Sequence, residues 1–322
     1  MKLTGKSFWE KLKKPIFVIA PMANVTDVAF RAMFAKYGKP DVMWTEFVSA
    51  DGLCSPGRKV LLHDLEFSKK ERPIVAQLFS AHPEKMKGAS ALVQELGFDG
   101  IDLNMGCPAR EVEKQGAGSG HIKDPKLALE VIQAAREGAP KLPISVKTRI
   151  GYNKVEIDTW IVTLLEQKLP ALTVHLRTRK EMSDVPAHWE LMPKIVELRN
   201  KISPETLIIG NGDVESLEDA HKKIKESGCD GVMVGRGIFG NPWFFAGKTV
   251  TPRERLEVML EHAKTFDKLL GGIKNFAIMK KHFKAYVNGW EGAKDLRIKL
   301  MEADTLKDVN KIVKEYLIHG KI

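Results

Sequence analysis

The stretch GIDLNMGCPAREVEKQGAGSGHIKDPKLALEVIQAAREGAPKLPISVKT, residues 100–148, contains one complete unit of the predicted fold. Its first segment, 100–103, is short and apolar, and a polar loop follows it. Residues 125–137 then carry apolar side chains at helical spacing, before a second apolar segment begins at 144. Short apolar segments that alternate with helices are typical of parallel sheets, because helices cover both faces of such sheets. The stretch therefore predicts a β-α-β unit.

This unit recurs along the first 235 residues. Short apolar segments lie at 16–20, 42–47, 74–79, 100–103, 144–148, 172–176, 207–209 and 232–234. Helical spacing is found at 27–37, 83–96, 125–137, 155–167, 189–199 and 215–227. Eight strand–helix units over this length favour a (β/α)8 TIM barrel, an α/β fold, over an open Rossmann sheet. Residues 49–72 are irregular and predict an excursion loop.

The pattern changes after residue 245. Apolar residues at helical spacing recur at 252–270, 276–287 and 305–317, and glycines at 271–272 and 289–292 interrupt them. We therefore expect a TIM-barrel domain at 1–248, followed by a small C-terminal all-α helical domain at 249–322.

Composition excludes several classes of protein. With 43% hydrophobic residues among 322, the chain is not intrinsically disordered. No apolar run reaches the roughly 18 residues of a membrane helix, and the basic start carries no cleavable signal. The three cysteines lack the spacing of a disulfide scaffold or a zinc site. We expect a cytoplasmic protein without a metal or a membrane, and a monomer.

The positive charge is concentrated in the C-terminal part. The chain has a net charge of +10, and residues 252–322 hold 15 Lys and Arg against 10 Asp and Glu. Half of the excess therefore lies in less than a quarter of the chain. A basic helical piece suggests a polyanion such as RNA as partner, although a solvated helical surface explains the charge equally well.

Glycines and charged residues follow the last two predicted strands. Asn211-Gly212-Asp213 ends the seventh and Gly235-Arg236 ends the eighth. Loops at these two places often bind phosphate in barrels, because backbone N–H groups and an arginine can converge there. Two tight turns are the structural alternative. Lys147 ends the fifth strand, where it would stabilise an anion, form a Schiff base or extend to solvent.

Other strand ends carry weaker signals. His175 ends the sixth strand and is either a ligand-binding residue or a core histidine. Gln77 ends the third, where its amide can donate to and accept from the edge of a flat heterocycle. Pro21-Met22-Ala23 follows the first, and its methionine would pack under an aromatic ring system or simply fill the core.

Cys107 is the single residue whose position points most clearly to a chemical role. It lies in a Gly-Cys-Pro turn after the fourth strand, three residues beyond Asn104. A cysteine presented on a loop of the active face of a barrel points to a chemical role. Cys54 and Cys229 lack this setting.

Together these motifs resemble the signature of the flavin-dependent tRNA-dihydrouridine synthases, most closely the bacterial B-type branch. The motifs that carry the resemblance are Ala20-Pro21-Met22, Gln77-Leu78-Phe79, Leu103-Asn104-Met105-Gly106-Cys107-Pro108, Gln115-Gly116-Ala117-Gly118-Ser119, Val146-Lys147-Thr148-Arg149, His175 with Arg177-Thr178, Asn211-Gly212-Asp213 and Gly235-Arg236-Gly237. They cover residues 16–245 in the order of the family. The resemblance extends more weakly into the tail, through Lys281-His282 and through Gly292-Ala293 with Leu296-Arg297.

The resemblance implies an FMN enzyme that reduces uridine in tRNA to 5,6-dihydrouridine, with NADPH reducing the flavin first. The residues implied to bind FMN are Pro21, Met22, Ala23, Gln77, Lys147, His175, Asn211, Gly212, Asp213, Gly235 and Arg236. Asn104 and Arg177 would lie near the uracil. Hydride transfer from the flavin to uracil C6 leaves an enolate, and Cys107 would donate the proton to C5, since a thiol with a pKa of about 8.5 is mostly protonated at neutral pH.

A basic surface is also needed to bind tRNA and to offset the cost of extruding a base. The candidates in the loops after Cys107 are Arg110, Lys114 and Lys123, and those in the tail are Lys280, Lys281, Lys284, Arg297 and Lys299. The chain departs from the family pattern at Leu176 and in the loop 182–189, and it places Glu111 and Glu113 near Cys107. These departures concern the substrate-facing loops, and no motif encodes which uridine is reduced.

Two other functions remain open from the sequence. One is an FMN barrel oxidoreductase for a small dihydropyrimidine-type molecule, against which the basic tail argues. The other is a non-catalytic RNA-binding relative, against which Cys107, Lys147 and the predicted phosphate loops argue.

Overall fold

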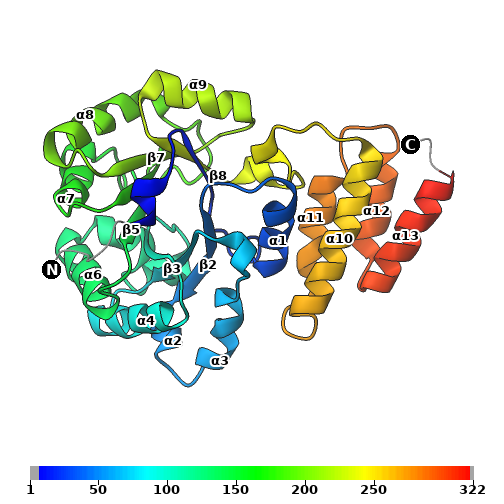
Figure 1. Cartoon of the computed structure of the whole chain (residues 1–322), viewed down its shortest axis with the longest axis horizontal. Helices are drawn as coiled ribbons and strands as arrows, with labels where there is room; N and C mark the ends of the chain where they lie inside the picture. The colour runs from blue at the N-terminus through cyan, green and yellow to red at the C-terminus, as the bar shows by residue number, and fades with distance from the viewer. Residues whose placement is uncertain (1–6, 320–322) are drawn as a thin grey trace.

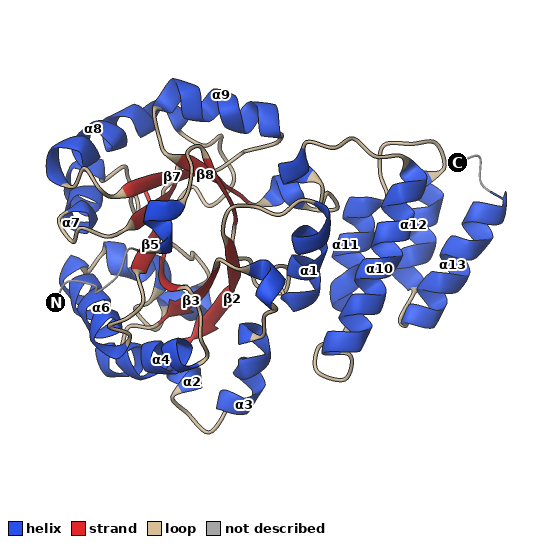
Figure 2. Ribbon diagram, in the orientation of Figure 1, coloured by secondary structure: helices blue, strands red, loops and turns tan. Residues whose placement is uncertain are grey.

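The computed structural model describes residues 7–319, so the ends of both predicted domains lie outside the described residues. Its sheet has eight parallel strands in the order β1-β8-β7-β6-β5-β4-β3-β2. Their bounds are β1 (Ile16–Ile19), β2 (Met43–Ser49), β3 (Ile74–Phe79), β4 (Gly100–Met105), β5 (Ile144–Arg149), β6 (Ala171–His175), β7 (Leu207–Asn211) and β8 (Gly231–Val234). The sheet closes where Val18 of β1 bridges Val42, the residue before β2. The predicted TIM barrel is confirmed (Figure 2).

Helices surround the barrel (Figure 1). They are α1 (Val28–Tyr37), α4 (Pro83–Glu95), α5 (Arg110–Glu113), α6 (Pro125–Gly138), α7 (Val162–Leu165), α8 (Met192–Ile202) and α9 (Leu217–Ser227). The predicted helix 155–167 is a π-helical turn, η5 (Ile157–Ile161), followed by α7. There the Trp160 indole donates to Thr148 Oγ1 at 2.8 Å, which ties the turn to β5. The predicted excursion 49–72 contains only short helices, among them α2 (Ala50–Leu53) and α3 (Arg58–Leu61).

The amino end of the barrel is closed by apolar side chains. Trp9, from the short helix η1 (Phe8–Lys11), packs with Trp44 and Met233 from the strands. A second and larger apolar layer lies between the sheet and the outer helices. Because this end is plugged, the carboxyl ends of the strands are the face of the barrel on which a site can form.

The C-terminal part is all-α, as predicted. It contains α10 (Pro252–Leu270), α11 (Met279–Tyr286), α12 (Ala293–Glu302) and α13 (Leu306–His319), with the short η9 (Phe276–Ile278) before α11. Thr251 begins α10 with a capping box that includes Glu254. Helix α12 was not predicted. It begins at Ala293, directly after the stretch 289–292 whose glycines indicated a break.

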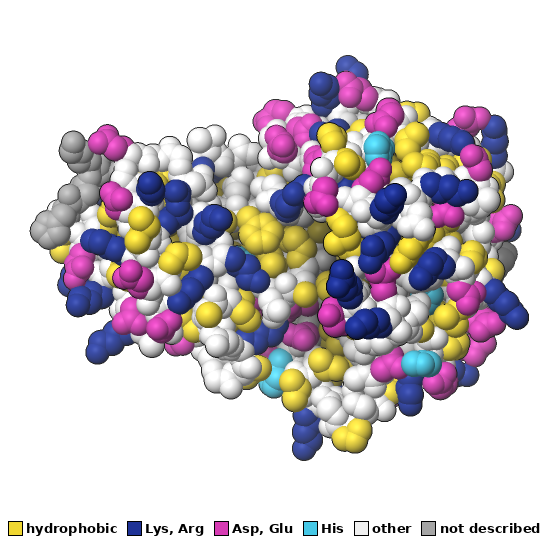
Figure 3. Space-filling model, turned by 180° about the vertical axis from the view of Figure 1, so that it is seen from behind, with side chains coloured by type: hydrophobic (Ala, Val, Ile, Leu, Met, Phe, Trp, Pro, Cys, Tyr) yellow, Lys and Arg dark blue, Asp and Glu magenta, His cyan; other side chains and the backbone are white. Residues whose placement is uncertain are grey.

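The tail docks on helix α1 of the barrel (Figure 1). Val28 and Met33 of α1 share an apolar core with Leu256, Met259 and Phe283 of the tail. On the face drawn in Figure 3, Lys and Arg side chains spread over both parts, and hydrophobic side chains lie in the hollow where the parts meet. Among residues 7–319, no helix is long and apolar enough to cross a membrane.

Candidate active site

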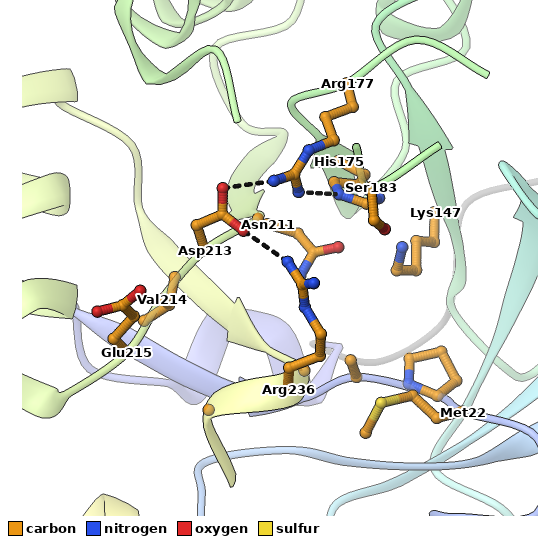
Figure 4. A pocket seen from close by; sticks show the side chains of 15 residues that line it. Met22, Lys147, His175, Arg177, Ser183, Asn211, Asp213, Val214, Glu215 and Arg236 are labelled. Atoms are coloured by element: carbon orange, nitrogen blue, oxygen red, sulfur yellow. Dashed lines mark hydrogen bonds and ion pairs between the residues drawn. The ribbon is translucent and has the colours of Figure 1, made fainter. Parts of the chain in front are cut away.

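A pocket of about 480 Å³ lies at the carboxyl ends of the strands (Figure 4). Five strand ends contribute to it: those of β1, β5, β6, β7 and β8. It is lined by Ala20, Pro21, Met22, Lys147, His175, Arg177, Ser183, Asn211, Gly212, Asp213, Val214, Glu215, Gly235, Arg236 and Gly237. Most of the predicted cofactor residues are therefore brought together in one cavity. Ala23, Gln77, Asn104 and Cys107 are not part of its lining.

The backbone on one side of the pocket requires glycine. Gly212 has a φ of +128°, and a Cβ there would lie 2.7 Å from the Ala187 Cβ. A Cβ on Gly237 would overlap the Val214 carbonyl. These loops therefore pack against neighbouring segments too closely to admit a side chain at either glycine.

Asp213 joins two arginines at the rim of the pocket. Its Oδ2 accepts from Arg177 Nη2 at 2.5 Å and its Oδ1 from Arg236 Nη2 at 2.8 Å. Partial burial disfavours the charged carboxylate, but the Arg177 hydrogen bond and both positive charges hold the pKa of Asp213 below its usual value. The Arg236 side chain remains 67% exposed, so it can also bind an incoming anion.

Two basic side chains occupy the inner part of the pocket. Burial, with the positive charge of Arg149 nearby, lowers the pKa of Lys147 to about 8. Its amine forms no ion pair with any of residues 7–319, and it lies across the cavity from Asp213 (Figure 4). Burial and the surrounding cations lower the pKa of His175 well below its usual value, so the imidazole is neutral. Because an arginine only donates, His175 Nε2 accepts from Arg177 Nη1 at 3.2 Å.

The Cys107 loop is held from two sides. Asn104 Oδ1 accepts the N–H groups of Gly106, at 3.2 Å, and Cys107, at 2.9 Å. The Cys107 carbonyl accepts the N–H of Ser119 at 3.0 Å and its hydroxyl at 2.9 Å. The thiol is half-buried, and burial raises its pKa. It therefore stays protonated at neutral pH.

Arg149 connects this loop to the loop after β6. It is 5% exposed, and its Nε donates to the Gly106 carbonyl at 2.9 Å. Its Nη1 donates to the carbonyls of Thr178, at 3.0 Å, and Met182, at 2.9 Å. The sequence motif Val146-Lys147-Thr148-Arg149 contains this arginine but predicts no role for it. Its position as the last residue of a strand was the available signal.

Glu113, one of the two acidic residues after Cys107, is neutralised within the structure. It pairs with Arg179 and accepts from the Tyr152 hydroxyl at 2.6 Å. Burial opposes the charged form, but these two partners hold the pKa of Glu113 below its usual value. Lys123 lies 4.7 Å from the centre of the Tyr152 ring, in cation–π contact.

The residues predicted to contact RNA differ in their exposure and in whether they already have partners within the protein. Arg110, Lys114, Lys123, Lys284 and Lys299 are exposed. Lys280 pairs with Asp304 at 2.9 Å, and Arg297 donates to the Val287 carbonyl at 2.8 Å. Lys281 is half-buried, and burial lowers its pKa.

A further ion cluster links the tail to the barrel. Lys274, between α10 and α11, pairs with Glu46 of β2 at 2.5 Å and with Asp64 at 2.7 Å. Glu46 is 4% exposed and also accepts the backbone N–H of Asn24, two residues beyond Met22 of the pocket. Residues so distant in sequence gave no signal that they would meet.

Residues 7–319 contain no group of three or more His, Cys, Asp or Glu side chains placed to hold a metal ion. The polar groups of the site include one thiol, neutral amides and an imidazole, several cations, and the Asp213 carboxylate that two of these cations, Arg177 and Arg236, already hold. Such a set suits an anionic ligand together with a proton transfer to a carbon or oxygen.

The comparisons with known proteins agree with one another. The dihydrouridine synthase (Dus) family model matches residues 18–319. A probable tRNA-dihydrouridine synthase of Staphylococcus aureus (strain COL) is 41% identical over 316 residues, which cover 97% of this chain and 96% of that protein. A probable tRNA-dihydrouridine synthase 2 of Bacillus subtilis (strain 168) is 40% identical over 316 residues, 97% of each chain.

Among solved structures, histamine dehydrogenase from Rhizobium sp. 4-9 resembles this chain with a TM-score of 0.52. It is 11% identical and matches 77% of this chain and 48% of its own, so the likeness concerns the fold alone. The match to the family model and the identity to its members cover nearly the whole sequence. The chain therefore belongs to the dihydrouridine synthase family.

Proposed function

We propose that this protein reduces the C5=C6 bond of uridines in tRNA to give 5,6-dihydrouridine, with FMN in the pocket and NADPH as the reductant. The observation that carries the proposal is a pocket that combines Lys147, His175 and the glycine loops after β7 and β8 at one end of the barrel. The two relatives, whose names state tRNA-dihydrouridine synthase, support tRNA as the substrate.

The pocket fits FMN. Lys147 has no anionic partner among residues 7–319 and Arg236 is largely exposed, so both are available to an anionic ligand. A Cβ on Gly235 would meet only pocket-lining atoms of Ala20 and Met22, at 3.7 and 3.9 Å, so the backbone there leaves room for a ligand such as a phosphate. We assign FMN binding to Pro21, Met22, Ala23, Gln77, Lys147, His175, Asn211, Gly212, Asp213, Gly235 and Arg236.

The proposed chemistry divides between the cofactor and the chain. FMN held in this pocket and reduced by NADPH would supply the hydride for uracil C6, which is electrophilic because the double bond is conjugated to the C4 carbonyl. Cys107 donates the proton to C5, and burial favours its protonated form. Lys147 stabilises negative charge in the pocket, and Asn104 and Arg177 lie beside the uracil. The hydride and the proton together add two hydrogen atoms across the bond.

The tRNA is proposed to lie across both parts of the molecule. We assign residues 1–248 as the catalytic domain and 249–322 as the tRNA-binding domain, within which Lys284 and Lys299 are the exposed cations of the predicted set. On the barrel, Arg110, Lys114 and Lys123 are exposed near the Cys107 loop. Lys280 contributes from the position in which Asp304 holds it, and Arg297 from the position set by the Val287 carbonyl. Lys281 contributes as a half-buried cation.

The test is nucleoside mass spectrometry of tRNA that lacks dihydrouridine, after incubation with the protein, FMN and NADPH. We expect uridine to gain the mass of two hydrogen atoms, and fragment mapping of the same sample locates the position. No gain, in a protein whose flavin NADPH still bleaches, would contradict tRNA as the substrate and favour a small dihydropyrimidine-type molecule. A protein that takes up no flavin would contradict the reaction as a whole.

A further inference from the structure

A row of polar side chains crosses three neighbouring strands inside the barrel. The strand register pairs Gln77 of β3 with Asp102 of β4, and Asp102 with Ser145 of β5. Asp102 Oδ2 accepts from Gln77 Nε2 at 2.6 Å, and Oδ1 accepts from Ser145 Oγ at 2.6 Å. Gln77 Oε1 in turn accepts from Asn104 Nδ2 at 3.0 Å. Asp102 and Gln77 are fully buried and Asn104 is 7% exposed.

The carboxylate of Asp102 decides the orientation of both amides. A carboxylate only accepts hydrogen bonds, so the NH₂ group of Gln77 must face Asp102. The Gln77 oxygen then points the other way and can only accept, so the NH₂ group of Asn104 must face it. This leaves the Asn104 oxygen on the side of the Cys107 loop.

That oxygen is what holds the loop. It accepts the backbone N–H groups of Gly106 and Cys107. If the Asn104 amide turned over, its NH₂ group would face these two N–H donors, and both hydrogen bonds would be lost. The loop would then be held mainly by Ser119 and Arg149.

Asp102 is buried without a cationic partner in direct contact, since it forms no ion pair with any of residues 7–319. Burial raises its pKa to about 6, while the hydrogen bonds from Ser145 and Gln77 and the positive charge of Lys147 nearby act in the opposite direction. A buried carboxylate costs free energy. Stability alone therefore does not explain why a carboxylate stands at this position. Its ability to accept hydrogen bonds on both oxygens does.

We propose that Asp102 is a positioning residue, which fixes the orientation of the Gln77 and Asn104 amides and thereby the place of the Cys107 thiol. The proposal rests on the proposed function, in which this thiol donates a proton, and it adds to that function the residue that aims the donor. Asp102 acts through two other side chains and touches no reacting atom.

Three variants separate orientation from charge. Asp102→Leu keeps the branched shape and removes every acceptor, so both amides are free to turn over. Asp102→Asn removes the charge but can keep an oxygen toward Gln77, because the Ser145 hydroxyl can accept from the new amide and donate to the Ile101 carbonyl, 3.3 Å away. Ser145→Ala is the matched control. It removes the hydrogen bond from Ser145 to Asp102 and leaves the hydrogen bonds that connect Asp102 through Gln77 and Asn104 to the Cys107 loop.

The first readout is the rate at which iodoacetamide alkylates Cys107 in the flavin-loaded protein, followed by peptide mass spectrometry with Cys54 as internal reference. We expect Asp102→Leu to increase the Cys107 rate by roughly fivefold or more, since fivefold corresponds to losing one of the two hydrogen bonds that the Asn104 oxygen accepts. Asp102→Asn and Ser145→Ala should stay close to the wild-type rate. Equal effects of the Leu and Asn variants would overturn the proposal in favour of a charge effect, and no effect of Asp102→Leu would overturn it outright.

The second readout is the split between kcat and KM on tRNA. Asp102→Leu should lower kcat by about tenfold or more at an unchanged KM, because the proton donor is misplaced while the RNA surface is intact. A KM change without a kcat change would contradict the positioning role. Alkylation does not depend on turnover, so a protein inactive on tRNA would refute the proposed function and leave the positioning of Cys107 to be decided by the first readout.

A measurement on the wild-type protein covers the case in which Asp102→Leu does not fold. The side-chain amide protons of Gln77, observed by NMR with selective ¹⁵N labelling, should shift as Asp102 titrates, because one of them lies on the carboxylate. Those of Asn104 should follow with a smaller shift. Amide signals that do not change over this titration would exclude the chain of hydrogen bonds.

Discussion

The carboxyl end of the barrel and the junction between barrel and tail both bury polar side chains. The two regions differ in how many hydrogen-bond partners these side chains have. At the barrel end, Asp102 accepts two side-chain hydrogen bonds and Arg149 donates to three carbonyls. At the junction, His262 and His282 are fully buried, with ring centres 4.8 Å apart. Among the described residues, neither ring nitrogen of His282 has a hydrogen-bond partner.

This difference decides which groups can be charged. A buried charge is tolerated where donors or acceptors surround it, and a buried group without them stays neutral. Burial accordingly lowers the pKa of His262 to about 3 and that of His282 well below its usual value. The barrel end is thus built to hold charge at neutral pH. At the junction the paired Lys274 cluster also holds charge, whereas the packing around His262 and His282 requires neutral imidazoles.

The largest effect should come from the thiol at the barrel end. We expect Cys107→Ala to lower dihydrouridine formation by about 100-fold or more, since it removes the proposed proton donor. Flavin content should stay unchanged, because Cys107 does not line the pocket. Cys54→Ala, at the other half-buried cysteine, is the control and should retain activity. Nucleoside mass spectrometry gives the rates, and full turnover by Cys107→Ala would remove the proton-donor role.

The junction should respond to acid. The pKa of His262 is depressed on folding, so the unfolded chain binds the extra proton first. Above about pH 6.5 the histidine is neutral in both states and does not lower the free energy of unfolding. As the pH falls from there toward 3, protonation of the unfolded chain lowers the free energy of unfolding progressively. At pH 5 this loss is about 2 kcal/mol for one histidine. Urea unfolding at pH 7 and pH 5 measures it.

His262→Phe should remove about that much of the pH dependence, and His221→Gln, at an exposed histidine, should leave it unchanged. An equally steep pH dependence in the His262→Phe variant would show that other groups govern the acid response. The neutral histidines of the junction would then not set its response to acid, and the contrast with the barrel end would fail.

Lys147 is the exception at the barrel end, because its amine has no ion-pair partner there among residues 7–319. We expect Lys147→Met to weaken FMN binding by about tenfold or more, the value of one charge-assisted hydrogen bond. Fluorescence titration of the flavin measures this. Lys123→Met is the control, since Lys123 lies on the Tyr152 ring outside the pocket. Equal affinity of both variants would place the FMN anion away from Lys147.

The parts of this picture that sequence could predict are those set by neighbouring residues. A short apolar strand followed by a polar loop identifies both the barrel and the strand-end residues of the site, because parallel strands end on one face. A role for Asp102 could not be predicted, because its partners lie on two other strands and only the strand register brings them together. Helix α12 escaped because the preceding glycines indicated a break, and its first turn depends on packing of Ala293 and Leu296 in the tail core.

The smallest effect should come from two lysines of α11, and it tests whether the tail surface is free to bind RNA. Lys284 is exposed, whereas Lys280 is 27% exposed and pairs with Asp304. Lys284→Ala should therefore weaken tRNA binding and lower the slope of log K against log salt by about 1, as for a lost phosphate contact. Lys280→Ala should change the slope less, because its charge is already partly neutralised by a carboxylate. Filter binding over a range of salt concentrations separates the two. Equal slopes for both variants would mean that RNA displaces Asp304 from Lys280, and the tail would then exchange its ion pairs on binding.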